Sequence, residues 1–136
     1  MLAKPQTFMN LSGQAVGALA RFYKVPLERI MIVYDDVDLP LGALRLRPTG
    51  GSAGQKGMAS IIERLGSQDF PRLRIGIGRP PGRMDAAAYV LQDFSKAEQE
   101  FLEATLERAV AAIYTWATLG LESAMNKYNG SEQNGA

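Results

Sequence analysis

Three carboxylates stand together at the end of an apolar run, and they are the first candidates for chemistry. The run from Ile30 to Tyr34 is followed by Asp35, Asp36 and Asp38, and Leu39-Pro40 then turns the chain. Its β-branched residues predict a buried strand over 30–34. Ligands of open α/β sheets bind beyond the carboxyl ends of the strands. We therefore expect a functional site where this strand ends.

The three carboxylates are compatible with three different roles. Hard cations prefer carboxylate oxygens, so the cluster could hold Mg²⁺. Asp35 could instead orient a base or a water molecule at a catalytic centre. One of the three could simply cap the turn through an Asx hydrogen bond. Alternation along an extended segment would put Asp36 and Asp38 on one side and Asp35 on the other.

A glycine-rich segment, Thr49–Gly57, is the second candidate for ligand binding. It contains four glycines and leads directly into a predicted helix, an arrangement that favours anions. Its spacing matches neither a Walker A motif nor GxGxxG, so a plain flexible loop remains the alternative. The predicted helix ends at Gly66, and its apolar face consists of Met58, Ile61, Ile62 and Leu65.

Positive charge is concentrated in the middle of the chain. Residues 39–84 hold eight basic and two acidic side chains, a net charge of +6, whereas residues 85–136 hold three basic and eight acidic ones, a net charge of −5. Two predicted strands, 43–48 and 73–77, carry arginines at alternate positions; Leu44 and Leu46 should face inward, and Arg45 and Arg47 outward. This middle region suits a polyanionic partner, although a merely solvated face is equally compatible with it.

Composition removes several classes of function. The 136 residues include no cysteine and no histidine, which excludes disulfides, thiolate metal sites and a histidine base drawn from these residues. No apolar run reaches the length of a membrane span, and the start shows no signal-peptide pattern. We expect one domain in the cytoplasm.

Helices should flank the strands. The first is predicted to begin at an N-cap, Asn10 or Ser12, and to end near Lys24 because Pro26 follows; its buried face is Val16, Leu19, Ala20 and Tyr23. The longest should begin at the capping box Ser95–Glu98 and end at Gly120, with a short helix at 121–128 beyond it. Its apolar stripe is Leu102, Leu106, Ala109, Ile113 and Trp116.

Four segments together resemble one family. They are Lys4–Gly13, Tyr34–Pro40 with Gly42, Gly50–Gly54 with Gly57-Met58, and Phe70–Pro80. In their order and sequence they are similar to bacterial peptidyl-tRNA hydrolases. That resemblance implies a single-domain α/β/α sandwich around a mixed β-sheet, covering residues 1–128, with a flexible tail at 129–136.

The resemblance also implies an activity and a partner. The family cleaves the ester between a peptide and the 3′ ribose of tRNA, which recycles tRNA, and it uses no metal and no cofactor. The expected partner is peptidyl-tRNA, contacted at its acceptor stem and 3′ end, and the expected state is a monomer.

Roles for individual residues follow from the same resemblance. Asn10 would position the attacking water or the substrate carbonyl, and Asp35 would orient a catalytic histidine. Arg47 and Arg74 would clamp a tRNA phosphate. The remaining residues expected to bind substrate or tRNA are Phe8, Met9, Gln55 and Lys56.

The chain departs from the family pattern in two places. The family has His-Asn where this chain has Gln55-Lys56, and its first strand and catalytic histidine precede the first motif. We therefore expect a hydrolase whose sequence is N-terminally truncated.

The alternatives are a catalytically silent RNA-binding relative and a Mg²⁺-dependent phosphoryl-transfer enzyme that uses Asp35–Asp38. The silent relative would bind RNA through Arg45, Arg47, Arg74, Arg79 and Arg83.

Overall fold

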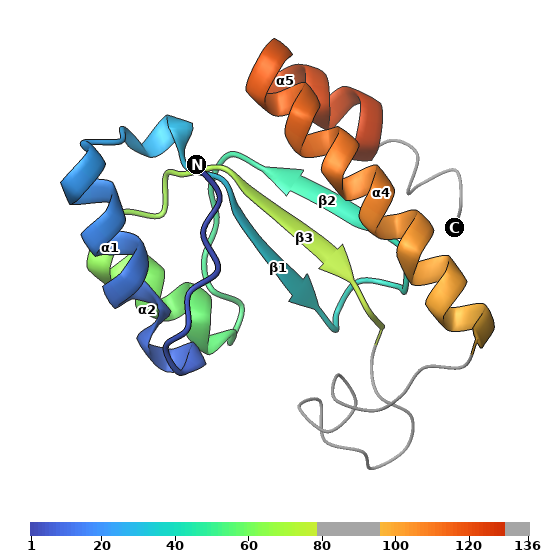
Figure 1. Cartoon of the computed structure of the whole chain (residues 1–136), viewed down its shortest axis with the longest axis horizontal. Helices are drawn as coiled ribbons and strands as arrows, with labels where there is room; N and C mark the ends of the chain where they lie inside the picture. Colours follow the sequence, from blue (N-terminus) through green and yellow to red (C-terminus); the bar gives the residue numbers. More distant parts are fainter. Residues whose placement is uncertain (79–95, 130–136) are drawn as a thin grey trace. The chain divides into compact units, whose positions relative to one another are not determined.

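The computed structural model describes residues 1–78 and 96–129, and the chain forms two compact units (Figure 1). The first unit comprises residues 1–30 and 48–71, and the second comprises residues 31–47 and the chain from 72 onward. The predictions for Arg79, Arg83, Ser95 and the tail beyond residue 129 fall outside the described residues.

The second unit contains a three-stranded mixed sheet in the order β1-β3-β2 (Figure 1). The strands are β1 (Ile32–Asp36), β2 (Leu44–Arg47) and β3 (Arg72–Gly76). β1 runs parallel to β3, and β2 runs antiparallel to it. The mixed α/β sheet expected from the sequence is therefore confirmed.

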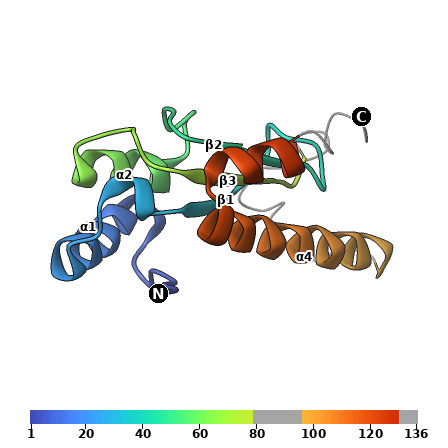
Figure 2. The same cartoon turned by 90° about the horizontal axis from the view of Figure 1, so that it is seen from above.

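One face of this sheet is apolar and carries the core. Helix α4 (Lys96–Leu119) runs along that face, as Figures 1 and 2 show from two directions. The chain then continues through α5 (Leu121–Ala124) and the π-helical turn η3 (Met125–Asn129). The buried core consists of Leu44, Leu46, Leu73, Ile75, Ala109, Ala112, Ala124 and Tyr128.

Two predictions about burial in this unit are wrong. β1 is not a buried strand: its residues alternate between half-buried and exposed, and Val33 is 43% exposed. On α4, Leu106 is 46% exposed, so it does not belong to the buried stripe. Small side chains face the sheet instead because they let the helix approach closely. The buried residues of α4 are Thr105, Ala109, Ala112 and Thr115.

The first unit is built on α1 (Ser12–Tyr23), which packs against α2 (Lys56–Leu65). Two 3₁₀ turns, η1 (Met9–Leu11) and η2 (Leu27–Arg29), flank α1 in the chain. The predicted end of α1 near Lys24, the apolar face of α2 and the Gly66 C-cap are confirmed.

The predicted start and buried face of α1 need correction. Neither Asn10 nor Ser12 caps the helix: its N-cap is Leu11, and the Ser12 hydroxyl donates to the Met9 carbonyl at 2.8 Å. The buried positions of α1 are Ser12, Gly13 and Gly17, while Tyr23 is 53% exposed. A hydrophobic pattern does not identify glycines as the contact surface between helices.

Among the helices that the structure describes, none combines the length and the apolar character that crossing a membrane requires.

Candidate functional site

The face of the sheet opposite the core carries four arginines, which we call the arginine face: Arg45, Arg47, Arg72 and Arg74. The register opposes Arg45 to Arg74 and Arg47 to Arg72 on the paired strands β2 and β3. Residues opposed in this way project from the same side of a sheet. Arg47 and Arg74, which the sequence analysis assigned to one phosphate clamp, therefore lie diagonally on neighbouring strands and share a face.

The half-buried Tyr34 of β1 contacts Arg72 on the arginine face. Arg72 is only 2% exposed, and it hydrogen-bonds to the side chain of Tyr34. Burial raises the pKa of Tyr34 above its ordinary value of 10.0, against the opposing positive charges of Arg74 and Arg72. The phenol is therefore protonated at neutral pH, where its hydroxyl can both accept and donate hydrogen bonds.

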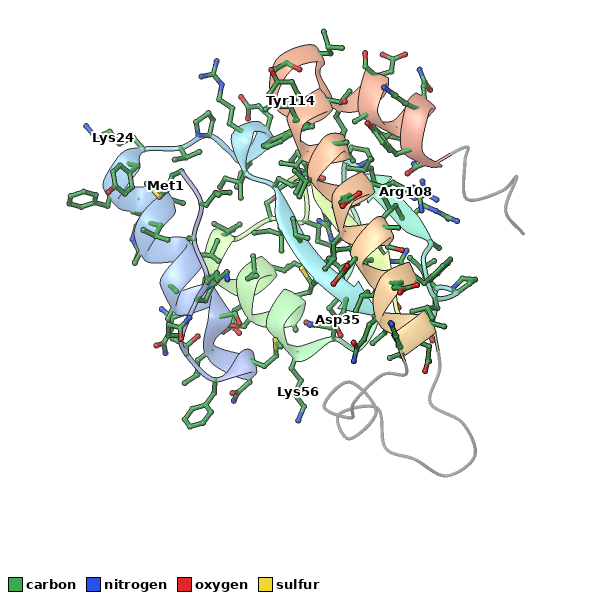
Figure 3. All side chains as sticks on the ribbon, turned by 45° about the vertical axis from the view of Figure 1, so that its right-hand side comes forward. Met1, Lys24, Asp35, Lys56, Arg108 and Tyr114 are labelled. Atoms are coloured by element: carbon green, nitrogen blue, oxygen red, sulfur yellow. The ribbon has the colours of Figure 1, made fainter. Side chains whose placement is uncertain are left out.

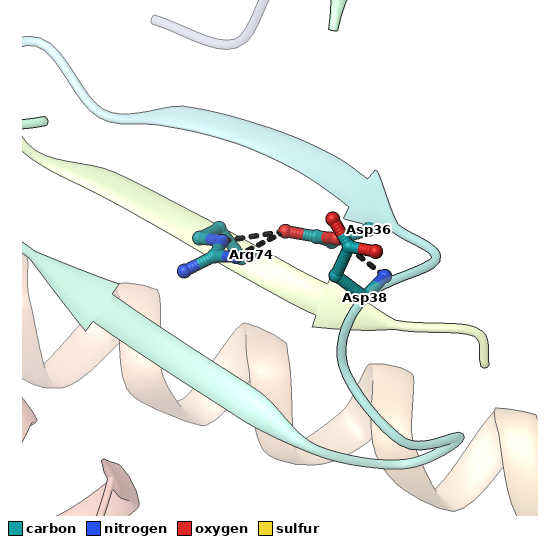
Figure 4. Close-up of polar contacts among 3 residues, drawn as sticks. All are labelled: Asp36, Asp38 and Arg74. Carbon is teal, nitrogen blue, oxygen red and sulfur yellow. Dashed lines mark hydrogen bonds and ion pairs between the residues drawn. The ribbon is translucent and has the colours of Figure 1, made fainter. Parts of the chain in front are cut away.

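Asp36 pairs with Arg74 across the strands (Figure 4). Its Oδ2 accepts hydrogen bonds from Nε at 2.6 Å and from Nη2 at 2.5 Å. Its Oδ1 accepts from the backbone N–H of Asp38 at 2.7 Å. The Asx turn considered in the sequence analysis is thus present, and Asp36 forms it.

The turn that follows β1 is tied to the end of β3 and to α4. The backbone N–H of Gly42 donates to the Gly76 carbonyl at 3.1 Å, and the N–H of Gly78 donates to the Leu39 carbonyl at 2.9 Å. From α4, Arg108 donates to the Gly42 carbonyl at 3.1 Å. These bonds hold the segment that carries the carboxylates against both neighbours.

Asp35 lies apart from the arginine face. It pairs with Ile75 in the register, so its side chain leaves the sheet on the side opposite to Arg74. The carboxylate is exposed near the end of β1 (Figure 3) and has no hydrogen-bond or ion-pair partner within residues 1–78 and 96–129. It is available to orient a polar group that approaches this end of the strand.

In the first unit, Gln55 joins the start of α2 to Met9. Its Oε1 accepts from the Met58 N–H at 2.7 Å and caps the helix, and its Nε2 contacts the Met9 sulfur at 3.6 Å. Gly57 makes this approach possible, because a Cβ at that position would lie 2.7 Å from the Met9 sulfur. The structure therefore brings two predicted substrate-binding residues, Met9 and Gln55, into contact.

The other predicted residues of this unit are open to solvent. Phe8 is 80% exposed and Met9 56%. Asn10 and Lys56 are also exposed, and Figure 3 shows Lys56 projecting from the first turn of α2. The amide of Asn10 has no hydrogen-bond partner in the described part of the chain. Together with the N-terminus of α2, these side chains offer hydrogen-bond donors and positive charge to an anionic or carbonyl-bearing ligand.

Sequence reasoning missed the parts played by Asp36, which pairs with the arginine face, and by Arg72, which belongs to it. Asp36 was considered only with its neighbours in the acidic cluster, and Arg72 only as one of the basic residues in the middle of the chain. The available signal was the alternation of Arg72 and Arg74 along β3, but the pairing of β3 with β1 was not known. Without that register, nothing in the sequence places Asp36 beside Arg74.

The carboxylate cluster does not assemble into a metal site in the described residues, where no group of three or more potential ligands comes together. Asp36 already accepts from Arg74 and from the Asp38 backbone, so a cation at Asp36 would have to displace an arginine.

The fold and these side chains define a class: an α/β protein whose mixed sheet offers a face of arginines suited to phosphate. Comparison with known proteins is more specific. The family model described as peptidyl-tRNA hydrolase matches residues 1–135, and the chain belongs to that family.

Individual relatives agree with this assignment. The chain is 62% identical over 114 residues to the chloroplastic peptidyl-tRNA hydrolase of Arabidopsis thaliana, covering 83% of this chain and 40% of that protein. It is 51% identical over 129 residues to the peptidyl-tRNA hydrolase of Syntrophomonas wolfei, covering 95% of this chain and 69% of that one. The crystal structure of the Acinetobacter baumannii peptidyl-tRNA hydrolase superposes with a TM-score of 0.82 at 33% identity, covering 92% of this chain and 63% of that one. The chain thus spans between two fifths and about two thirds of the length of these relatives.

Proposed function

We propose that this protein acts in the hydrolysis of peptidyl-tRNA, cleaving the ester between the peptide and the 3′ ribose of the tRNA. The family match over residues 1–135 carries this proposal. The arginine face supports it independently, because a protein that acts on tRNA must bind a polyanion.

Binding of the tRNA is assigned to Arg47 and Arg74. Both are only partly exposed, and they project from one face of paired strands, which restricts their geometry. Guanidinium groups match phosphate oxygens with paired hydrogen bonds. Such contacts fix the position and register of a nucleic acid without reading its sequence.

The reacting end of the substrate is assigned to residues of the first unit. Asn10 would hold the attacking water or the ester carbonyl through its amide, and Phe8 and Met9 would contact the peptide. Gln55 and Lys56, at the start of α2, would hold the 3′ end of the tRNA.

Asp35 would orient a histidine that takes the proton of the attacking water. The 136 residues contain no histidine, so such a base is not one of them.

The missing histidine favours a second candidate function. A chain with the arginine face and without a base would bind tRNA or another structured RNA and leave the ester intact. Peptidyl-tRNA as partner, the monomeric state and the cytoplasmic location stay predictions in either case; the relatives include both bacterial and chloroplastic proteins.

One experiment separates the two functions. The purified protein is mixed with tRNA carrying a labelled N-acetyl-aminoacyl group, and release of the label and retention of the tRNA are measured in the same samples. Enzyme-dependent release supports hydrolysis. Retention that weakens with salt and is accompanied by no release supports RNA binding alone, and neither retention nor release would contradict both.

A further inference from the structure

The two carboxylate oxygens of Asp36 have different partners, and this division of roles points beyond the proposed function. Oδ1 accepts a hydrogen bond from the Asp38 N–H and so stabilises the turn. Oδ2 accepts from Nε and Nη2 of Arg74. Both side chains are largely shielded, with exposed fractions of 10% for Asp36 and 23% for Arg74. Charge-assisted hydrogen bonds of this length, shielded from water, hold a side chain firmly.

The pairing occupies only one edge of the guanidinium group. Arginine presents five N–H donors in a planar fork, and Asp36 takes the edge formed by Nε and Nη2. Figure 4 shows the third nitrogen, Nη1, pointing away from Asp36. The Arg74 side chain has no other hydrogen-bond partner among residues 1–78 and 96–129. As far as the described residues go, the end of the fork is therefore open to an external acceptor.

We infer that Asp36 is a positioning residue that holds Arg74 by one edge so that its other edge binds an RNA phosphate. This inference rests on the proposed function, since it takes the tRNA backbone as the ligand. A long side chain that is already fixed loses less conformational entropy on binding than a mobile one. Asp36 therefore strengthens phosphate binding by orientation, although its own charge is repulsive to phosphate.

The alternative is that Asp36 only neutralises Arg74. The two possibilities predict opposite changes in RNA affinity when Asp36 is removed. If Asp36 merely cancels the positive charge, its removal frees Arg74 and tightens RNA binding. If Asp36 orients Arg74, its removal weakens binding even though the protein becomes more positive by one charge.

Asp36→Asn shows whether RNA affinity rises or falls when the contact with Arg74 is lost, and it disturbs the turn little. The Asn carbonyl oxygen still accepts from the Asp38 N–H, whereas its NH₂ group cannot accept from Arg74. Asp38→Asn is the matched control: it changes the net charge equally, and the backbone N–H that enters the turn stays in place. The comparison of the two variants thus isolates the orientation of Arg74 from the change in charge.

Affinity for tRNA is measured by fluorescence anisotropy across a series of salt concentrations, with thermal unfolding as the check on folding. We expect Asp36→Asn to bind roughly three- to tenfold more weakly than Asp38→Asn, with a salt slope shallower by up to about one. Partial unfolding would lower the apparent affinity at every salt concentration, but by itself it would not make the salt dependence of tRNA binding shallower. The double variant of Asp36→Asn and Arg74→Ala should bind no more weakly than Arg74→Ala, because the two residues act through one contact.

Arg74→Lys provides a second approach that leaves Asp36 intact. Lysine keeps the charge but has no planar fork to divide between a carboxylate and a phosphate, so we expect weaker binding than in the unaltered protein. Binding by Asp36→Asn that equals or exceeds that of Asp38→Asn overturns the inference, as does unchanged binding by Arg74→Lys. If Arg74→Ala itself leaves the affinity and salt slope unchanged, the phosphate clamp of the proposed function fails and this inference fails with it.

Discussion

At the scale of single residues, Asp35 and Asp36 are adjacent in sequence but differ in surroundings. Asp36 is bound to Arg74 and to the turn, whereas Asp35 is exposed on the other side of the sheet without a partner in the described residues. An oriented, shielded carboxylate suits a structural or positioning role, and an open one suits contact with a mobile or external group. The role proposed for Asp35 depends on such a group.

Asn10 provides a test of the proposed chemistry at one side chain. Its exposed amide makes no internal hydrogen bond in the described residues, so Asn10→Ala should change the free energy of unfolding by no more than about 0.5 kcal/mol. If the protein hydrolyses N-acetyl-aminoacyl-tRNA, the substitution should lower the rate by at least about a hundredfold. The affinity for tRNA should remain nearly the same. Single-turnover kinetics and anisotropy measure the two effects, and unchanged turnover would remove Asn10 from the reaction.

Tyr34 gives a prediction for stability at alkaline pH. Burial raises its pKa in the folded protein above the ordinary 10.0, so at high pH the unfolded chain loses this proton first. The stability contributed by Tyr34 is complete below about pH 10 and is lost as the pH rises through the higher folded value.

Tyr34→Phe should remove this dependence, so that its melting temperature falls less steeply above about pH 10 than that of the unaltered protein. Thermal unfolding of both proteins across that range measures the difference. The hydrogen bond from Arg72 that Tyr34→Phe loses lowers the melting temperature by an amount that is constant at lower pH. Parallel curves would show that Tyr34 is as accessible as in the unfolded chain.

At the scale of elements, the sequence predicted the two faces of β2 correctly, but not the burial of β1 or the contact surfaces of the helices. The alternation of leucine and arginine identified both faces of β2, because a period of two leaves one arrangement with the leucines buried. The family resemblance supplied the mixed sheet. The proposed roles of the site residues, in contrast, remain predictions, since the structure shows where they lie and not what they bind.

Helix surfaces were harder to predict because small residues carry the contacts. On α1 the buried positions include Gly13 and Gly17, and on α4 they include Ala109 and Ala112. Hydrophobicity ranks leucine above these residues, but the distance between packed elements decides which residue fits. That distance depends on partners distant in sequence.

A pair of glycine substitutions tests the close packing of α1 on α2. A Cβ on Gly13 would collide with the backbone carbonyl of Ser60, whereas a Cβ on Gly17 would lie 3.4 Å from the Arg64 Cβ. We expect Gly13→Ala to destabilise the protein by about 3 kcal/mol, the upper end of the usual effect of overpacking. Gly17→Ala should be neutral or stabilising by up to about 1 kcal/mol, because alanine favours helix. Denaturant unfolding of both variants checks this, and equal midpoints would contradict it.

Within residues 1–78 and 96–129, the outer edge of β2 pairs with a side chain and not with another strand. The amide of Asn129 donates to the Leu46 carbonyl at 2.9 Å and accepts from the Leu46 N–H at 2.7 Å. The sequence predicts a flexible tail from residue 129, since a lone asparagine gives no sign of pairing with a residue so distant in sequence. Because Leu46 lies between Arg45 and Arg47, the hydrogen bonds from Asn129 also stabilise the strand that carries these two arginines.

Substitutions of Asn129 should therefore lower stability. Asn129→Ala removes two hydrogen bonds and should cost about 2 kcal/mol. Asn129→Asp places a carboxylate oxygen against the Leu46 carbonyl and should be destabilised at neutral pH. It should recover as the pH falls below about 4, where a protonated carboxyl can donate. Denaturant unfolding at both pH values measures this, with Asn129→Ala as the control for acid effects elsewhere; an equal response of both variants to pH would argue against the paired geometry.

At the scale of the whole molecule, the distribution of charge matters more than its sum. The net charge is only +1, yet the arginines gather on one face of the sheet while α4 carries four of the glutamates, at 98, 100, 103 and 107. A polyanion responds to the local potential of such a face, which is screened within about 10 Å at ordinary salt. Binding of RNA should therefore depend strongly on ionic strength despite the small net charge.

The size of that dependence follows from the number of phosphates contacted. If Arg45, Arg47 and Arg74 each neutralise one phosphate, the affinity for tRNA should fall roughly 20- to 40-fold between about 50 and 200 mM salt. Anisotropy titrations measure the slope, and Arg47→Ala should make it shallower by somewhat less than one. Arg29→Ala, which removes an exposed arginine of η2 outside the arginine face, is the matched control and should leave the slope unchanged. A slope near zero, or an equal change in both variants, would mean that RNA is held elsewhere on the molecule.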